Sequence, residues 1–187
     1  MDYKNVLDLI LDSDDVTVGG GSASALSGAI ACGLIGMVCK LSVKKDFGIP
    51  PDEQLKLADE LDDIREKLLT GVVEDANAYG VIRDAYKLPK STEEEIQLRK
   101  EAIAKAGIVG ANTPMENAKL CKRVYDIGIS LEGKSNPNCH SDLVIGYDLA
   151  KVGTNGCLMN IEANLSLVKD EEKIQEFKNA IKELKID

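Results

Sequence analysis

The stretch that decides the fold runs from Thr17 to Ser42 and reads TVGGGSASALSGAIACGLIGMVCKLS. It opens on three consecutive glycines, and no charged residue occurs from Val16 to Cys39. Small residues recur in two rows at steps of four, Ser24–Gly28–Cys32–Gly36 and Ala25–Ala29–Gly33. Residues four apart share one face of a helix, and a helix that is apolar all round is buried. We therefore predict a tightly packed central helix over residues 20–43.

Three other interpretations of this stretch fit less well. A P-loop needs a Lys followed by Ser or Thr after the glycines, and that pattern is missing here. The G-x-G-x-x-G dinucleotide fingerprint is broken at Ser24, and no strand–helix–strand pattern surrounds it. The stretch has the roughly 20 residues of a membrane span, but it consists mainly of Gly, Ala and Ser. The glycines would still expose free N–H groups at the helix start, where an anion is favoured.

Composition restricts the class of protein and its partners. The 187 residues are enough for one domain with a real core. The formal net charge of −9 disfavours nucleic acid and anionic membrane surfaces as partners. Five cysteines without paired metal-ligand spacing, one histidine and no basic-then-apolar leader predict reduced thiols in the cytoplasm and no metal site.

The rest of the chain also shows helical periodicity, and no segment alternates convincingly with period two. Apolar residues at steps of three and four predict one long helix over residues 51–88, with a face formed by Leu61, Ile64, Leu68, Val72, Tyr79, Ile82 and Tyr86. Amphipathic segments near both ends and a second central helix over 141–167 complete the pattern. We predict an all-α multihelical bundle with two buried central helices, in a single domain spanning residues 1–187.

Two capping patterns predict helix starts in the second half of the chain. Ser91 with Glu94 three residues later matches a capping box. Thr113 repeats the pattern, with Pro114 at the first helical position and Glu116 reaching back. We therefore expect new helices to begin at both places.

Asp75 lies among the apolar positions of the long helix and is the first candidate for chemistry. Most helix carboxylates are solvated, but burial on an apolar stripe would raise the pKa of this carboxyl. Carboxyl groups with a raised pKa suit general acid–base catalysis. Asp142 follows Ser141 in a first helical turn, where its charge equally well complements the helix dipole.

Polar side chains also interrupt the second central helix. Asn160 and Asn164 share a face one turn apart. A buried amide must find hydrogen-bond partners, either in a neighbouring backbone or in a ligand. His140 is the sole imidazole, and a lone histidine beside a loop is more often incidental than catalytic.

Four motifs resemble a known family when they are taken together. They read GGGSASALSGA, DANAYGVIRDAYKLPKSTEEEIQLR, NPNCHSDL and GCLMNIEANL, and they extend from about Gly19 to Leu165. With them the sequence resembles the formiminotetrahydrofolate cyclodeaminase and methenyltetrahydrofolate cyclohydrolase family. The resemblance implies a multihelical fold, a homodimer, and a tetrahydrofolate substrate that includes polyglutamylated forms. The family's prolines before the glycines are missing here, and so is the transferase part of its bifunctional members.

The resemblance also implies roles for individual residues. Asp75 matches the acidic position of the family's D-A-x-A-[YF] motif and is the first catalytic candidate, and Asp142 of the N-x-x-x-x-S-D motif is the second. We expect substrate contacts from the glycine stretch and from the other motif positions: Gly19, Gly20, Gly21, Ser22, Lys90, Arg99, Asn136, Ser141, Asn160 and Asn164. No metal ligands and no further cofactor are expected.

Three functions remain open at the level of the sequence. We favour hydrolysis of 5,10-methenyltetrahydrofolate to 10-formyltetrahydrofolate, because the chain stands without a transferase part. An ionised Asp75 could move protons and oppose the positive charge of the substrate. The alternative is a formiminotetrahydrofolate cyclodeaminase that releases ammonia. A second alternative is a non-catalytic module that binds folate or only dimerises, and the presence of Asp75 speaks against it.

Overall fold

The computed structural model describes residues 1–187. The chain forms six α-helices, one short 3-10 turn and no strand, which confirms the predicted all-α class. The helices are α1 (Tyr3–Leu11), α2 (Gly20–Leu41), α3 (Pro51–Lys87), α4 (Glu93–Ser130), α5 (His140–Asn164) and α6 (Glu171–Leu184), with the 3-10 turn at Pro137–Cys139. The two central helices are therefore α2 and α5, and both end a few residues earlier than predicted.

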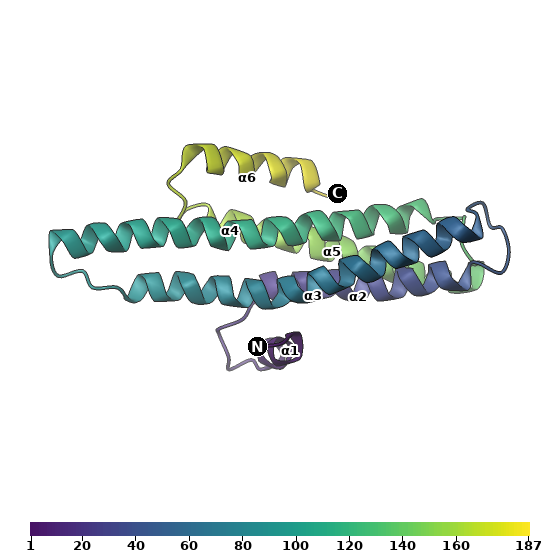
Figure 1. Cartoon of the computed structure of the whole chain (residues 1–187), viewed down its shortest axis with the longest axis horizontal. Coiled ribbons are helices and arrows are strands. Elements are labelled where there is room, and N and C mark those ends of the chain that lie inside the picture. Colours follow the sequence, from purple (N-terminus) through teal and green to yellow (C-terminus); the bar gives the residue numbers. More distant parts are fainter.

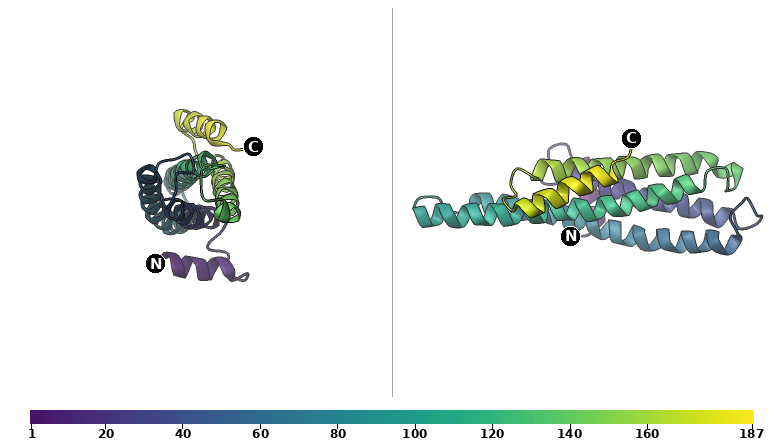
Figure 2. Two further views of the ribbon diagram at one scale, coloured as in Figure 1. Left: turned by 90° about the vertical axis from the view of Figure 1, so that its right-hand side faces the viewer. Right: turned by 90° about the horizontal axis from the view of Figure 1, so that it is seen from above.

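Helices α2 to α5 form an antiparallel four-helix bundle in which α2 packs against α3 and α5, and α4 packs against α3 and α5 (Figure 1). Helix α1 contacts α3 and α2 on one side of the bundle, and α6 contacts α4 and α5 on the opposite side (Figure 2). Helices α3 and α4 continue well beyond the start of α2 and the end of α5 (Figure 1). The bundle therefore steps from four helices to two part-way along its length.

Small residues bring α2 and α5 into close contact. A Cβ added to Gly153 of α5 would lie 2.8 Å from the Ser24 carbonyl oxygen of α2, and one added to Gly28 would press on the Cys121 sulfur of α4. All four members of the predicted row that contains Ser24 and Gly28 are buried. The small-residue row therefore does what the sequence indicates: it lets neighbouring backbones approach.

Helix α2 is not buried on all sides, however, and this part of the prediction is wrong. Ile30 is 50% exposed, Met37 is 39% exposed, and a Cβ on Gly33 would meet nothing within 4 Å. The bundle covers α2 with α3, α4 and α5 and leaves its outer side open. By length and composition α2 could also cross a membrane, but 61% of the relevant stretch is buried inside the bundle, as in the core helix of a globular domain.

The open side of α2 continues onto α5. The Ser27 hydroxyl donates to the Leu149 carbonyl oxygen at 2.8 Å, so the side of α2 that carries Ile30 lies beside α5. Helix α5 leaves large apolar side chains exposed at steps of seven along its own length. We call this surface the apolar face; its members are Ile30, Met37, Ile145, Val152 and Met159.

The first predicted cap is displaced by one residue. Helix α4 begins after Thr92, whose side chain accepts from the backbone N–H of Glu95, and the Glu95 side chain accepts from Thr92 in return. The same Glu95 carboxylate accepts from the Ser91 N–H at 2.8 Å. Glu95 therefore satisfies two backbone donors at once, which the predicted pairing of Ser91 with Glu94 does not.

The second predicted cap does not exist, because α4 runs without interruption through Pro114. Thr113 is an interior residue of this helix, and its hydroxyl donates back to the Val109 carbonyl oxygen at 3.3 Å. A proline inside a helix leaves the carbonyl four residues earlier without its N–H donor. Here that carbonyl belongs to Gly110, and the Asn164 side chain of α5 donates to it at 2.9 Å. Tertiary contact thus compensates the local break.

The long helix α3 matches its predicted extent within one residue, but its predicted core face is only half buried. Leu61, Leu68 and Val72 are fully buried. Tyr79 and Tyr86 are each 47% exposed, because α2 starts beside the middle of α3 and does not cover the helix beyond that point. The exposed second half of α3 begins at the candidate site.

Candidate active site

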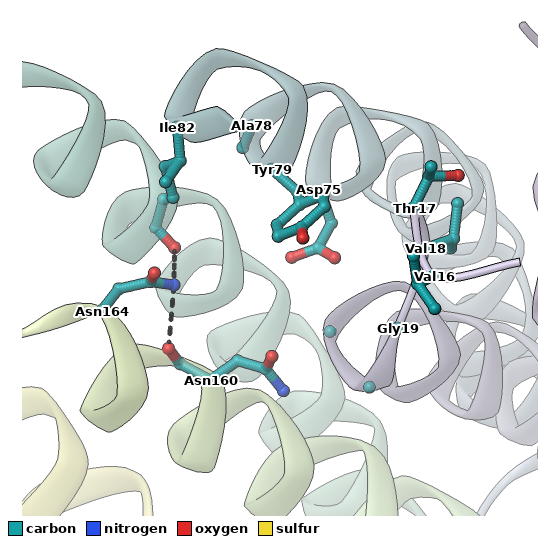
Figure 3. A pocket seen from close by; sticks show the side chains of 13 residues that line it. Val16, Thr17, Val18, Gly19, Asp75, Ala78, Tyr79, Ile82, Asn160 and Asn164 are labelled. Atoms are coloured by element: carbon teal, nitrogen blue, oxygen red, sulfur yellow. Dashed lines mark hydrogen bonds between the residues drawn. The ribbon is translucent and has the colours of Figure 1, made fainter. Parts of the chain in front are cut away.

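A cavity of about 240 Å³ lies where the bundle steps from four helices to two. The segment before α2, the first turn of α2, the middle of α3 and α4, and the end of α5 all contribute to its walls (Figure 3). Its lining comprises Val16, Thr17, Val18, Gly19, Gly20, Gly21, Asp75, Ala78, Tyr79, Ile82, Gly110, Asn160 and Asn164. Six of the residues predicted from the sequence therefore meet in one cavity: the three glycines, Asp75 and the two asparagines.

Asp75 projects from α3 into this cavity (Figure 3). The Ser22 hydroxyl lies 2.9 Å from its Oδ2 atom, and the Ser22 backbone N–H also faces the carboxylate. Burial raises the pKa of Asp75 above its ordinary value, although both Ser22 groups act in the opposite direction. This carboxyl combines access to a cavity with a pKa raised above its ordinary value.

Ser22 has a different place from the one predicted. It is fully buried behind Asp75 and does not line the cavity. Its hydroxyl contacts the Asp75 carboxylate and the Val72 carbonyl oxygen, at 2.9 and 3.0 Å. Ser22 therefore holds Asp75, and its contact with a substrate stays a prediction.

Gly21 allows the start of α2 to meet the carboxylate. A Cβ at this position would lie 2.7 Å from the Asp75 Cγ atom, closer than side chains pack. The N-cap residue Gly19 has no side chain to occupy the first N–H groups of the helix. Those N–H groups are therefore available to the Asp75 carboxylate and to a ligand, because helix N-termini favour negative charge.

The amides of Asn160 and Asn164 are oriented by backbone carbonyls. Asn160 Nδ2 donates to the Gly156 oxygen at 2.9 Å. Asn164 Nδ2 donates to the Gly110 oxygen at 2.9 Å and to the Asn160 oxygen at 3.1 Å, as the dashed lines in Figure 3 show. Carbonyl oxygens only accept, so each of these contacts must be made by the NH₂ group of the amide. Each Oδ1 atom is thereby left free to accept from a ligand.

The Asp75 carboxylate is the only charged side chain of the cavity, because no Lys, Arg or His lines it. The two asparagine amides and the Thr17 and Tyr79 hydroxyls complete its polar lining. Such a set suits a ligand group that carries N–H donors or positive charge.

Comparison with known proteins agrees with the motifs. The sequence pattern of the formiminotransferase-cyclodeaminase family matches residues 5–183, which is nearly the whole chain. The chain belongs to this family.

Three relatives show how far the similarity extends. A methenyltetrahydrofolate cyclohydrolase of Methylorubrum extorquens is 30% identical over 178 residues, covering 92% of this chain and 86% of that protein. A formimidoyltransferase-cyclodeaminase of Gallus gallus is 27% identical over 155 residues, covering 82% of this chain but 29% of that protein. The crystal structure of a formiminotetrahydrofolate cyclodeaminase from Thermotoga maritima matches with a TM-score of 0.75 and 25% identity, covering 98% of this chain and 91% of that chain.

The residues that match the N-x-x-x-x-S-D motif of the formiminotransferase-cyclodeaminase family lie far from the cavity. Asn136 donates to the Ser42 hydroxyl at 2.9 Å and to the Leu41 carbonyl oxygen at 3.3 Å, so it caps the far end of α2. With a rise of 1.5 Å per residue, that end lies about 30 Å from the glycines. Ser141 and Asp142 follow at the start of α5, at this same end. The fold of one chain does not bring them to Asp75, and their roles stay predictions.

The two predicted basic residues lie beyond the cavity in the other direction. From Asp75 to the end of α3 the helix rises about 18 Å, and Lys90 lies in the exposed loop that follows. Arg99 donates through Nε and Nη2 to the Tyr86 carbonyl oxygen, at 3.2 and 3.0 Å, and its guanidinium lies 5.4 Å from the centre of the Tyr86 ring. In the free chain Arg99 caps α3. Any contact of either residue with substrate stays a prediction.

Seven cavity residues were not predicted as site residues, and Tyr79, Ile82 and Gly110 are among them. Tyr79 and Ile82 follow Asp75 at steps of four and seven, so their spacing places them on the same face of α3. That signal was available, but it was interpreted as core packing. Gly110 was missed because the prediction placed a helix start at Pro114, which hides the fact that Gly110 precedes the proline by one helical turn.

The thiols and metal-binding side chains form no second site. All five cysteines are buried and unpaired, and burial raises the pKa of Cys32 and Cys39 to about 12. Such thiols remain protonated and are poor nucleophiles. No group of three His, Cys, Asp or Glu side chains is placed to hold a metal ion.

Proposed function

We propose that this protein hydrolyses 5,10-methenyltetrahydrofolate to 10-formyltetrahydrofolate, with Asp75 moving the proton and without a metal or another cofactor. The observation that carries the proposal is the Asp75 carboxylate, which is held by Ser22 and is the only charged side chain in a cavity that the Asn160 and Asn164 amides also line. The similarity to the Methylorubrum extorquens cyclohydrolase, at 30% identity over most of both chains, supports this reaction.

The substrate carries its positive charge on the carbon that bridges N5 and N10. A negative charge opposite this amidinium stabilises the bound cation and the transition state of water addition. Water forms a bond to the bridging carbon while Asp75 accepts one of its protons. The carbon–N5 bond then breaks, N5 takes up the remaining proton of the added water, and the carbon stays on N10 as a formyl group. One proton is released overall, and Asp75 passes it to solvent.

The environment of Asp75 suits a base of this kind. A carboxylate with a pKa raised by burial accepts a proton more readily than a solvated carboxylate. The hydroxyl and the backbone N–H of Ser22 hold the carboxylate in one orientation, so little reorganisation is needed when water attacks. The neighbouring Tyr79 ring is 47% exposed and offers an apolar surface beside the reacting carbon.

The second candidate function is formiminotetrahydrofolate cyclodeaminase activity. The similarity to the Gallus gallus protein and to the Thermotoga maritima structure favours it. In that reaction N10 attacks the formimino carbon and ammonia leaves, so protons must move between nitrogens through the same cavity. Asp75 would then act on nitrogen rather than on water.

The proposal includes a homodimer formed through the apolar face. Large apolar patches on a single chain mark interaction surfaces, and this one joins two neighbouring helices. The substrate within the proposal is folate in monoglutamyl or polyglutamylated form. The protein would act in the cytoplasm, where its five buried thiols stay reduced.

Loss of methenyl absorbance on mixing 5,10-methenyltetrahydrofolate with pure protein tests the main proposal, after subtraction of the uncatalysed rate. Asp75→Asn keeps the shape of the side chain and removes its proton-accepting charge. We expect turnover to fall by about 10²–10⁴, with folate affinity and folding retained. Asp142→Asn serves as the comparison. A larger loss of turnover in Asp142→Asn, or near-normal turnover in folded Asp75→Asn, would show that Asp75 is not the general base.

A second assay separates the two reactions. Ammonia release from formiminotetrahydrofolate is followed with the same preparation, and the reaction with the higher kcat/KM is the function. A protein that binds tetrahydrofolate but accelerates neither reaction would be a non-catalytic module.

The oligomeric state tests the apolar face. Val152→Glu places a charge on this surface and is expected to shift the protein from dimer to monomer in light scattering after gel filtration. Leu11→Glu, at the exposed end of α1, is the matched control and should leave the dimer intact. A monomeric wild-type protein would contradict this part of the proposal.

A further inference from the structure

Pro114 occupies an unusual position in the longest helix of the chain. It lies in the interior of α4, buried, far from either helix end. A proline there removes one backbone hydrogen bond and crowds the carbonyl one turn earlier, so it is strongly disfavoured unless something compensates. The site of the lost bond is Gly110, and Gly110 lines the candidate cavity.

The carbonyl that Pro114 frees is used by the cavity. Asn164 Nδ2 donates to it at 2.9 Å, across 54 residues of sequence, and donates its second hydrogen to the Asn160 carbonyl oxygen at 3.1 Å. Figure 3 shows the amide nitrogen between these two oxygens. With both hydrogens engaged, the only polar atom of the amide left for a ligand is its oxygen.

The packing around Gly110 restricts the amide further. A Cβ at position 110 would lie 2.6 Å from the Ile82 Cδ1 atom and 3.4 Å from the Asn164 Cγ atom. The absence of a side chain there lets Asn164 and Ile82 approach the backbone of α4 together. Gly110 and Pro114 thus act together. Gly110 lacks a side chain and so gives Asn164 access to its carbonyl oxygen, and Pro114 leaves that oxygen without a backbone donor.

We propose that Pro114 is a positioning residue for the cavity: by freeing the Gly110 carbonyl it fixes the Asn164 amide with its oxygen toward the ligand. The ligand group met there is one that donates, such as an N–H group of the pterin ring. The identity of the ligand rests on the proposed function, whereas the orientation of the Asn164 amide does not.

A restored N–H at position 114 should undo this arrangement. In Pro114→Ala the new backbone N–H competes for the Gly110 carbonyl, so Asn164 loses one partner and its amide can turn. Loss of one hydrogen-bond contribution corresponds to about a 3- to 10-fold weaker interaction. We expect KM, and the dissociation constant for tetrahydrofolate measured by calorimetry, to rise by that factor, with a smaller change in kcat. The melting temperature should not fall, because the helix regains a bond.

The decisive measurement is a double-mutant cycle with Asn164→Ala. If Pro114 acts through Asn164, Pro114→Ala has no further effect on KM or on tetrahydrofolate binding once the Asn164 side chain is absent. Equal effects of Pro114→Ala with and without that side chain would overturn the proposal. Thr113→Ala is the matched control, since its hydroxyl bonds the Val109 carbonyl outside the cavity. Pro114→Val, which also restores the N–H and keeps more volume, replaces Pro114→Ala if the latter is destabilised.

A second readout does not depend on turnover or on folate. The side-chain NH₂ resonances of Asn164 are identified by NMR from their loss in Asn164→Ala, and their exchange with solvent is measured in the free protein. Both hydrogens are bonded in the wild type, so exchange should be slow and should accelerate about 3- to 10-fold in Pro114→Ala. Unchanged exchange would refute the positioning role, even if the protein proves to be a cyclodeaminase or no enzyme at all.

Discussion

The Ser22 hydroxyl lies between the Asp75 carboxylate and the Val72 carbonyl oxygen, at 2.9 and 3.0 Å, and has one hydrogen for two acceptors. When Asp75 is ionised, Ser22 can donate to it. When Asp75 is protonated, the Ser22 hydroxyl can donate to the Val72 carbonyl oxygen and accept a hydrogen bond from the Asp75 carboxyl group, because a hydroxyl both donates and accepts. Ser22 thus keeps a partner for Asp75 in both protonation states, as a residue that takes up and releases a proton requires.

Removal of this hydroxyl should change the pH dependence of turnover. Ser22 lowers the pKa of Asp75 against the effect of burial, so Ser22→Ala should raise that pKa further. A hydrogen bond to a charged group contributes about 1.5–3 kcal/mol, or about one to two pH units. The rise of kcat/KM with pH, which reports ionisation of the base, should move upward by that amount. Ser27→Ala, whose hydroxyl bonds the Leu149 carbonyl, is the control. A pH profile that coincides with wild type would contradict this role of Ser22.

Asp75 should also make the stability of the protein depend on pH. Its folded-state pKa lies above the ordinary value of 3.8, so the folded state holds this proton more tightly than the unfolded state. Stability therefore falls as pH rises from about 3.8 through the raised pKa, and then levels off. Asp75→Asn does not titrate, so it should be more stable than wild type at neutral pH, and this advantage should vanish below pH 3.8. Urea unfolding of both proteins across this range measures the difference, and a constant difference would refute the shift.

The close contact of Gly21 with Asp75 predicts a loss of activity without a loss of fold. In Gly21→Ala the added methyl must push the carboxylate out of place, since its Cβ would lie 2.7 Å from Cγ. A displacement of about 1 Å commonly costs about 100-fold in rate. Gly80→Ala on α3, where a Cβ meets nothing within 4 Å, should keep turnover and gain up to about 1 kcal/mol of stability. Similar turnover in the two variants would show that Asp75 tolerates displacement.

Two glycines of α2 should respond in opposite directions to the same substitution. Gly28→Ala must displace the Cys121 sulfur and should lower the free energy of unfolding by about 1–3 kcal/mol. In a single chain Gly33→Ala adds its methyl in open space, between Ile30 and Met37, so in the monomeric Val152→Glu background it should be neutral or stabilising, by up to about 1 kcal/mol. Denaturant unfolding measures both. A clear destabilisation by Gly33→Ala in that monomeric background would contradict the open side of α2.

Activity should not depend on a divalent metal. A single histidine and buried, dispersed cysteines offer no ordinary set of zinc ligands. Turnover after dialysis against a chelator should match that of untreated enzyme within error. Loss of turnover that a divalent ion restores would require a metal in the mechanism.

The sequence by itself determined the local features of this protein. The row from Ser24 to Gly36 predicts close helix packing because residues four apart must share a helix face, whatever the rest of the chain does. The step from Asp75 to Tyr79 likewise places both on one face of α3. The motifs indicate Asp75, the glycines and the asparagines as site residues, together with others that the fold of one chain places away from the cavity.

Only the tertiary structure decided which faces are covered and which broken bonds are compensated. Whether α2 is buried at Gly33 depends on how many helices the bundle places around it, and no local pattern encodes that number. Whether Pro114 ends a helix depends on a donor for the Gly110 carbonyl, and that donor, Asn164, is 54 residues away in sequence. The N-x-x-x-x-S-D motif lies about 30 Å from Asp75 because α2 separates them by its full length. Burial and hydrogen-bond satisfaction are properties of the packed chain, so only the fold could settle them.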